Sequence, residues 1–216
     1  MKQKRAKNFF TGAEREKISE AVAAAEQHTA GEIATMVVDS SDGYREAETL
    51  GAILMAGSVA LLVAIFTQYV TVWTYIPLVC ILFLPCRYLF GREALLKLPF
   101  VGRLRIEEAV RERAIRAFYE KGLYKTRDET GVLIFISLLE RKVWILGDRG
   151  INAKIPADHW QTFAGEVASG IKENQACEAL CAVIGQCGAE LAKHFPRKAD
   201  DRNELPNEVL TETPRR

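Results

Sequence analysis

The sequence predicts an α/β sandwich built on a small mixed sheet and split by a two-helix transmembrane hairpin. Helical and strand patterns alternate along most of the chain, and one long uncharged stretch interrupts them. The chain has 216 residues with 29 basic and 28 acidic side chains, and none of these charges lies between Glu48 and Arg87. The near-neutral composition therefore combines a strongly charged domain with an apolar insert.

The uncharged stretch, residues 49–86, is too long for a single span. As one helix it would reach about 57 Å, nearly twice the hydrocarbon core of ~30 Å. It therefore predicts two spans, roughly residues 50–67 and 75–90, joined by a short turn. A long buried hairpin in a soluble protein is the alternative, but the complete absence of ionisable side chains favours the membrane. The aromatic residues expected at the headgroup level are Tyr69, Trp73 and Tyr75.

Charge near the hairpin predicts its orientation. Basic residues crowd its two ends: Arg45, Arg87, Arg92, Lys97, Arg103 and Arg105. By the positive-inside rule both halves of the soluble domain face the cytoplasm, which predicts a multi-pass protein of the cell membrane. The net charge of +1 argues against nucleic acid as a partner, because no basic excess is available to neutralise phosphates.

A stripe of alanines lies along the first span, four residues apart: Ala52, Ala56, Ala60 and Ala64. Small side chains let membrane helices approach closely. The stripe is expected to pack the first span against the second, and it would equally suit a dimer or another membrane protein. The predicted partners are therefore the lipid bilayer and a further membrane protein.

The charged remainder predicts one discontinuous domain. Thr11 and Glu14 form a capping box at the start of its first helix. We expect the domain to comprise residues 1–48 and 91–195, the hairpin residues 49–90, and a disordered tail residues 196–216. The expected elements, in order, are a helix at 12–28, a strand at 32–39, the hairpin, a helix at 103–121, strands at 132–139 and 143–146, and helices at 155–171 and 174–194. The first strand, the helix after the hairpin and the second strand can form a right-handed parallel crossover.

Five cysteines, an odd number, suit a reducing compartment. Cys177, Cys181 and Cys187 lie near His194, which raises the question of a metal site. They lack a C-x-x-C spacing, and buried thiols on a helix rich in alanine and glycine are the preferred interpretation.

Candidate chemistry is limited to acidic residues at strand ends, since the sequence carries no P-loop, GxGxxG, HExxH or GxSxG motif. Asp128 and Glu129 precede the second strand, and Asp148 follows the third. Because those strands form a hairpin, Asp128 and Asp148 are expected at the same end of the sheet, and Asp39 at the opposite end. Such oxygen ligands suit calcium or magnesium. The alternative is that they are solvated turn residues.

Several motifs of the soluble part resemble the TPM domain family. They cover about residues 9–48 and 103–195, with the hairpin as an insertion. The matching segments are residues 10–18 (FTGAEREKI), 26–33 (EQHTAGEI), 128–134 (DETGVLI) and 141–151 (RKVWILGDRGI). The resemblance implies an α/β/α sandwich and places the family's acidic cation or phosphatase site at Asp128 and Glu129. The family's usual Asp-Asn-Gly is Asp-Glu-Thr-Gly here, and Arg149 stands where Gly-x-Gly-Leu-Glu is expected, so Arg149 is a candidate for anion binding.

The family includes a chloroplast-lumen protein of photosystem repair credited with acid phosphatase activity, an auxiliary subunit of an acetylcholine receptor, and bacterial membrane proteins. This range implies that the domain does not fix one chemistry. The favoured hypothesis is an accessory, assembly or regulatory factor for membrane proteins. The alternative is a phosphatase-like hydrolase using a divalent cation held by Asp128, Glu129 and Asp148, and a third hypothesis is cation sensing without catalysis. Whether the chain is an enzyme stays open at this point.

Overall fold

The computed structural model describes residues 5–68, 71–197 and 204–212. The chain divides into two units, one comprising Met1–Ser41 with Glu107–Arg216 and the other Asp42–Ile106. The first unit contains a mixed sheet with helices, and the second contains two long apolar helices. The prediction of an α/β fold interrupted by a two-helix insert is confirmed.

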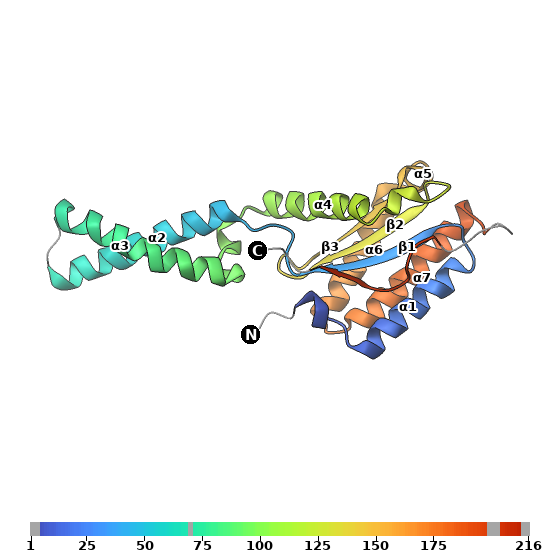
Figure 1. The fold of residues 1–216 in the computed structure, drawn as a ribbon, viewed down its shortest axis with the longest axis horizontal. Coiled ribbons are helices and arrows are strands. Elements are labelled where there is room, and N and C mark those ends of the chain that lie inside the picture. Colours follow the sequence, from blue (N-terminus) through green and yellow to red (C-terminus); the bar gives the residue numbers. More distant parts are fainter. Residues whose placement is uncertain (1–4, 69–70, 198–203, 213–216) are drawn as a thin grey trace. The chain divides into compact units, whose positions relative to one another are not determined.

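Four strands in the order β3-β2-β1-β4 form the sheet of the first unit (Figure 1). β1 runs parallel to β2 and to β4, and β2 and β3 form an antiparallel hairpin. The central strands β1 and β2 are buried at every position, because helices cover both of their faces. The bounds are β1 Glu32–Val38, β2 Gly131–Ser137, β3 Lys142–Gly147 and β4 Leu210–Glu212.

Helices lie on both faces of this sheet, as the α/β/α prediction requires (Figure 1). Ile33 and Val37 of β1 pack in one cluster with α1, α6 and α7, while Met36 packs in a second cluster with α4. Alternate side chains of a strand point to opposite faces, so one strand serves both cores. The helices are α1 Gly12–Glu26, α4 Arg103–Glu120, α5 Arg149–Asn152, α6 Ala157–Lys172 and α7 Ala176–His194, with short 3-10 turns η1 Ala6–Asn8, η2 Ala94–Leu96, η3 Leu98–Phe100 and η4 Leu123–Lys125.

The first helix begins where the capping box predicted. The Thr11 hydroxyl accepts a hydrogen bond from the Glu14 backbone N–H at 3.3 Å, and the Glu14 carboxylate accepts one from the Thr11 N–H at 2.7 Å. Two donors that the helix leaves unpaired are thereby satisfied.

The insert consists of α2, Arg45–Thr67, and α3, Val72–Arg92. Both helices are long and apolar enough to cross a membrane, with a mean hydropathy of 2.3 and 1.6 over their most apolar windows. Both extend beyond the predicted spans, since helical hydrogen bonding continues into the flanking charged residues. Tyr69, expected at the turn, lies outside the described residues.

The C-terminal segment differs from its prediction. Low apolar content predicted disorder over residues 196–216, whereas Leu210–Glu212 forms β4 beside β1. Main-chain hydrogen bonding to an existing sheet edge orders this segment without requiring a large apolar content. The parts of the prediction that concern residues 198–203 and 213–216 lie outside the described residues.

Candidate functional site

Two loops at one end of the sheet carry the predicted cation ligands. Asp128 and Glu129 lie just before β2, and Asp148 directly follows β3. The Asp148 backbone N–H donates to the Gly131 carbonyl at 2.8 Å, which extends the β2–β3 pairing to the loop residues. The parallel register of β1 and β2 starts here, with Glu32 opposite Gly131, so Asp39 lies at the opposite end as predicted.

The two loops approach each other through a glycine. A Cβ placed on Gly150 would lie 2.9 Å from the Asp128 carbonyl oxygen and 2.8 Å from that of Glu129. No real Cβ tolerates such distances, so this contact requires a residue without a side chain. The two loops therefore meet through their backbones, and two carbonyl oxygens face the start of α5.

Asp148 is the predicted ligand with the most constrained carboxylate. Its Oδ1 accepts from the Arg149 N–H at 2.7 Å and caps the short helix α5, while its Oδ2 is buried with no hydrogen-bond partner. The Asp128 and Glu129 side chains are exposed. Across residues 5–68, 71–197 and 204–212, no three His, Cys, Asp or Glu side chains gather as a metal centre requires. The donors thus amount to one buried carboxylate oxygen and loop carbonyls, which is fewer than calcium or magnesium normally takes from a protein.

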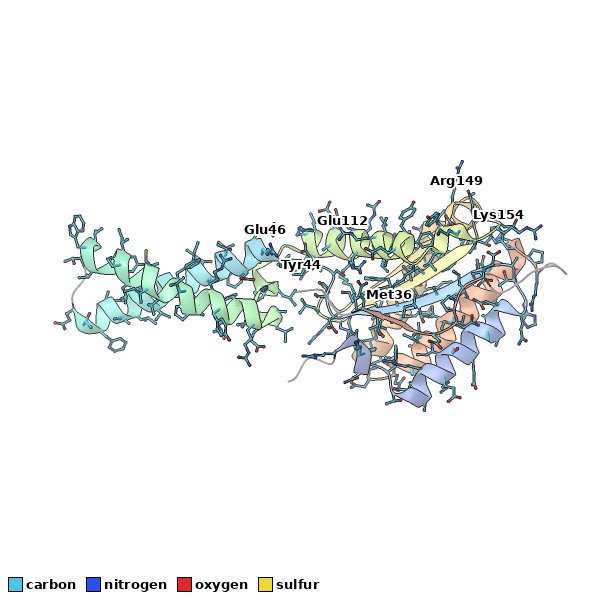
Figure 2. The ribbon with its side chains drawn as sticks, in the orientation of Figure 1. Met36, Tyr44, Glu46, Glu112, Arg149 and Lys154 are labelled. Carbon is cyan, nitrogen blue, oxygen red and sulfur yellow. The ribbon has the colours of Figure 1, made fainter. Side chains whose placement is uncertain are left out.

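Arg149, the candidate for anion binding, is exposed at the first position of α5 and points away from the fold (Figure 2). Its backbone N–H is taken by Asp148. An exposed guanidinium can meet an anionic group arriving from solvent, and its planar donors suit a carboxylate or phosphate.

All four alanines of the predicted stripe are buried between α2 and α3. Ala52 and Ala56 pack with Cys86 and Phe90 of α3. Near them the Tyr75 hydroxyl donates to the Gly57 carbonyl at 3.2 Å, which links the two helices a second time. The small side chains therefore set a close helix-to-helix contact within this unit.

A second acidic site lies at the edge of β1 and was not predicted. Glu26, at the end of α1, accepts from the Ile33 N–H at 2.9 Å through Oε1. Burial, reinforced by the nearby Glu32 carboxylate, raises the pKa of Glu26 from 4.5 to about 7, although Ile33, Asn207 and Arg197 act in the opposite direction. The only sequence signal was two acids flanking a glycine turn, which normally indicates a solvated loop.

The cysteines behave as the buried-thiol interpretation expects. Burial raises the pKa of the Cys177 thiol to about 11 and that of Cys187 to about 12, because the thiolate loses its hydration. Cys181 shifts in the same direction. His194 instead lies 3.6 Å from Glu190 on its own helix. A raised pKa keeps these thiols protonated and therefore weakly nucleophilic at neutral pH.

Two comparisons with known proteins found a similarity to this chain. The family model described as the TPM domain matches residues 100–190. Among solved structures, the chain is similar to the NMR structure of BA42 protein from the psychrophilic bacterium Bizionia argentinensis, with 22% identity and a TM-score of 0.60. The similarity covers 94% of this chain and 96% of that one, and at this identity it concerns the fold. A search of curated proteins returned no match.

Proposed function

Because the chain carries a TPM domain, matched over residues 100–190, we propose that it is a membrane-anchored protein that serves other membrane proteins as an accessory, assembly or regulatory factor. The TPM resemblance drawn from the sequence motifs is thereby confirmed. The proposal has two parts, the anchor and the accessory role, and they are supported by different observations.

The observation that carries the proposal is the packing of the hairpin, which has small side chains inside and large apolar side chains outside. This packing supports a membrane anchor. On α2 the internal contact is made by the alanine stripe, while large apolar side chains of both helices face outward: Phe66 is 86% exposed, Trp73 90% and Leu84 68%. A water-soluble helical hairpin has the opposite arrangement. Transfer of one such side chain from water to an apolar surrounding is worth about 1.5–3 kcal/mol, so lipid is the solvent that suits this surface.

Charges at the open end of the hairpin support a fixed depth and orientation. Lys97 is buried, and its Nζ donates to Glu48 Oε2 at 2.8 Å and to the Gly43 carbonyl at 3.1 Å. Arg87 Nε lies 4.0 Å from the other oxygen of Glu48. These pairs mark the end of the apolar stretch, and the excess of basic residues there supports a cytoplasmic location for both halves of the domain, with a multi-pass topology.

The anchor is tested by extraction and by labelling. The full chain should stay in the membrane pellet after alkaline carbonate treatment. In spheroplasts, a membrane-impermeant maleimide should label Gln68→Cys at the turn from outside, whereas Glu16→Cys on α1 should react only after lysis. The wild-type chain gives the background from its native thiols. Release by carbonate, or labelling of Glu16→Cys from outside, would contradict the anchor or its orientation.

The accessory role is supported by the outward apolar surface of the hairpin, which can meet a neighbouring protein as well as lipid, and by the TPM domain in the same chain. Photo-crosslinking amino acids placed at Leu84 of α3 and at the exposed Tyr119 of α4 test it in living cells. We expect a reproducible adduct with a membrane protein from at least one position, and none from the same probe at Glu16. Adducts with lipid alone, or none from either position, would refute the role.

A phosphatase-like hydrolase remains the second candidate, because the Asp148 Oδ2 atom is buried without a hydrogen-bond partner. Purified chain would have to hydrolyse a phosphomonoester in the presence of magnesium or calcium, and Asp128→Asn or Asp148→Asn would have to abolish the activity. Cation sensing without catalysis requires only that calcium raise the melting temperature, since a ligand of the native state must stabilise it. Activity that survives both substitutions would remove this site from consideration.

A further inference from the structure

The edge of β1 is occupied by the chain's own C-terminal segment, residues 204–212. Its strand, β4, pairs parallel with the last three residues of β1, placing Leu210 opposite Met36 and Glu212 opposite Val38. The remaining four residues of β1 have no main-chain ladder to this segment within the described chain. The segment is therefore held at its C-terminal end by backbone pairing and elsewhere by side chains.

Apolar contacts hold the segment at two points five residues apart. Leu205 and Leu210 pack against the cluster that contains Met36 and Phe118, and Val209 packs against the cluster on the other face of the sheet. Each of the nine residues is partly or fully exposed, while β1 beneath them is buried throughout. The segment 204–212 therefore lies on the surface over a buried strand. Segments with few buried contacts detach at a low cost in free energy.

Polar contacts recognise both the backbone and the acidic side chains of the segment. The two oxygens of Glu32 accept from the backbone N–H groups of Glu204 at 3.2 Å and Leu205 at 3.3 Å. The Arg127 N–H donates to the Glu204 carboxylate at 3.0 Å. At the other end Arg113, whose side chain is largely buried, forms an ion pair with Glu212.

We propose that the β1 edge is a docking site for an extended acidic peptide of a partner protein, and that residues 204–212 occupy it in cis. The contacts define the peptide: an acidic residue followed by leucine, a second leucine five positions later, and an acidic residue two positions beyond it. Main-chain pairing to the edge of a sheet supplies affinity, and pockets for alternate side chains of the peptide supply selectivity. The inference rests on the proposed accessory role and gives the chemistry of the element that is recognised.

The experiment uses the full chain in lipid nanodiscs and a fluorescein-labelled peptide with the sequence of residues 204–212 (ELPNEVLTE). The variant Leu205→Ser/Leu210→Ser releases the chain's own segment and should bind this peptide, as measured by fluorescence anisotropy. Wild-type chain should bind it at least tenfold more weakly, because the tethered segment competes at high effective concentration. Adding Arg113→Ala to the double variant should weaken binding about tenfold.

A control peptide with both leucines replaced by serine should not bind, and circular dichroism confirms that each variant is folded. If the double variant unfolds, Glu212→Lys takes its place, because it replaces the ion pair with Arg113 by a repulsion between two cations and so also releases the segment. A folded variant that does not bind the peptide, or that binds the control peptide equally well, would overturn the inference. Crosslinks from Leu84 and Tyr119 that persist in that case would leave the accessory role standing.

Discussion

Glu26 gives the molecule a stability that depends on pH, and Glu26→Gln tests it. The carboxyl group is held in a partly buried place beside Glu32, which raises its pKa from 4.5 to about 7. Between pH 4.5 and about pH 7, Glu26 is therefore protonated in the folded state and ionised in the unfolded state. The stabilisation from this protonation is complete below pH 4.5 and is lost as the pH rises through 7.

The magnitude follows from the size of the pKa change. A rise from 4.5 to about 7 corresponds to about 3 kcal/mol for a fully buried group, at about 1.4 kcal/mol for each unit of pKa. Glu26 is only partly buried, and solvent screening reduces the effect to about 1–2 kcal/mol. Glutamine keeps the acceptor for the Ile33 N–H and carries no charge at any pH. Glu26→Gln should therefore raise the free energy of unfolding by about 1–2 kcal/mol at pH 8.5 and change it little at pH 4.5.

Urea unfolding of the full chain in nanodiscs, followed by tryptophan fluorescence to which the buried Trp160 contributes, measures this difference. The matched control is Glu16→Gln, since Glu16 is an exposed acid on the same helix, and it should show no gain that depends on pH. A gain for Glu26→Gln of equal size at both pH values, or a loss at both, would refute the reasoning.

Five further substitutions, two of them controls, test the packing and the helix start. A Cβ on Gly188 would lie 2.6 Å from a side-chain carbon of α1, so Gly188→Ala should cost about 1–3 kcal/mol of overpacking strain. On the same helix a Cβ on Gly185 would meet nothing within 4 Å, so Gly185→Ala should instead raise the free energy of unfolding by up to about 1 kcal/mol. Urea unfolding measures both effects. In the hairpin, Ala56→Leu should force α2 and α3 apart and speed amide hydrogen exchange in α3, whereas Ser58→Leu on the exposed face should not. Thr11→Ala removes the N-cap of α1 and should cost about 0.5–2 kcal/mol in thermal unfolding, and an unchanged melting temperature would contradict the capping role.

Sequence reasoning succeeded where one local signal dominates. The absence of charge from 49 to 86 predicted the hairpin, and the capping box predicted the start of α1. The continuous apolar run after Gly131 predicted the strand at 132–139, and the structure has β2 there, buried at every position. These features depend on neighbours in the chain, so their residues can be recognised without knowing the fold.

The remaining features depend on residues far apart in sequence. Strand β4 has little apolar content and is ordered by the edge of β1, about 170 residues earlier in the chain. Glu140 is buried and accepts hydrogen bonds from the Ser41 N–H, almost 100 residues earlier in the chain, at 3.0 Å and from the Ser137 hydroxyl. Asp128 and Asp148 lie at the same end of the sheet, but the close backbone approach at Gly150 joins loops from two separate segments and could not be predicted.

The position of the hairpin between β1 and β2 has a consequence for biosynthesis. These strands pair along their whole length, yet residues 39–130 separate them, and the hairpin lies in that interval. The ribosome therefore completes β1 long before β2 exists, and both helices of the hairpin emerge in between. Since the central pairing must wait for the second strand, the domain can close only after both apolar helices have been synthesised.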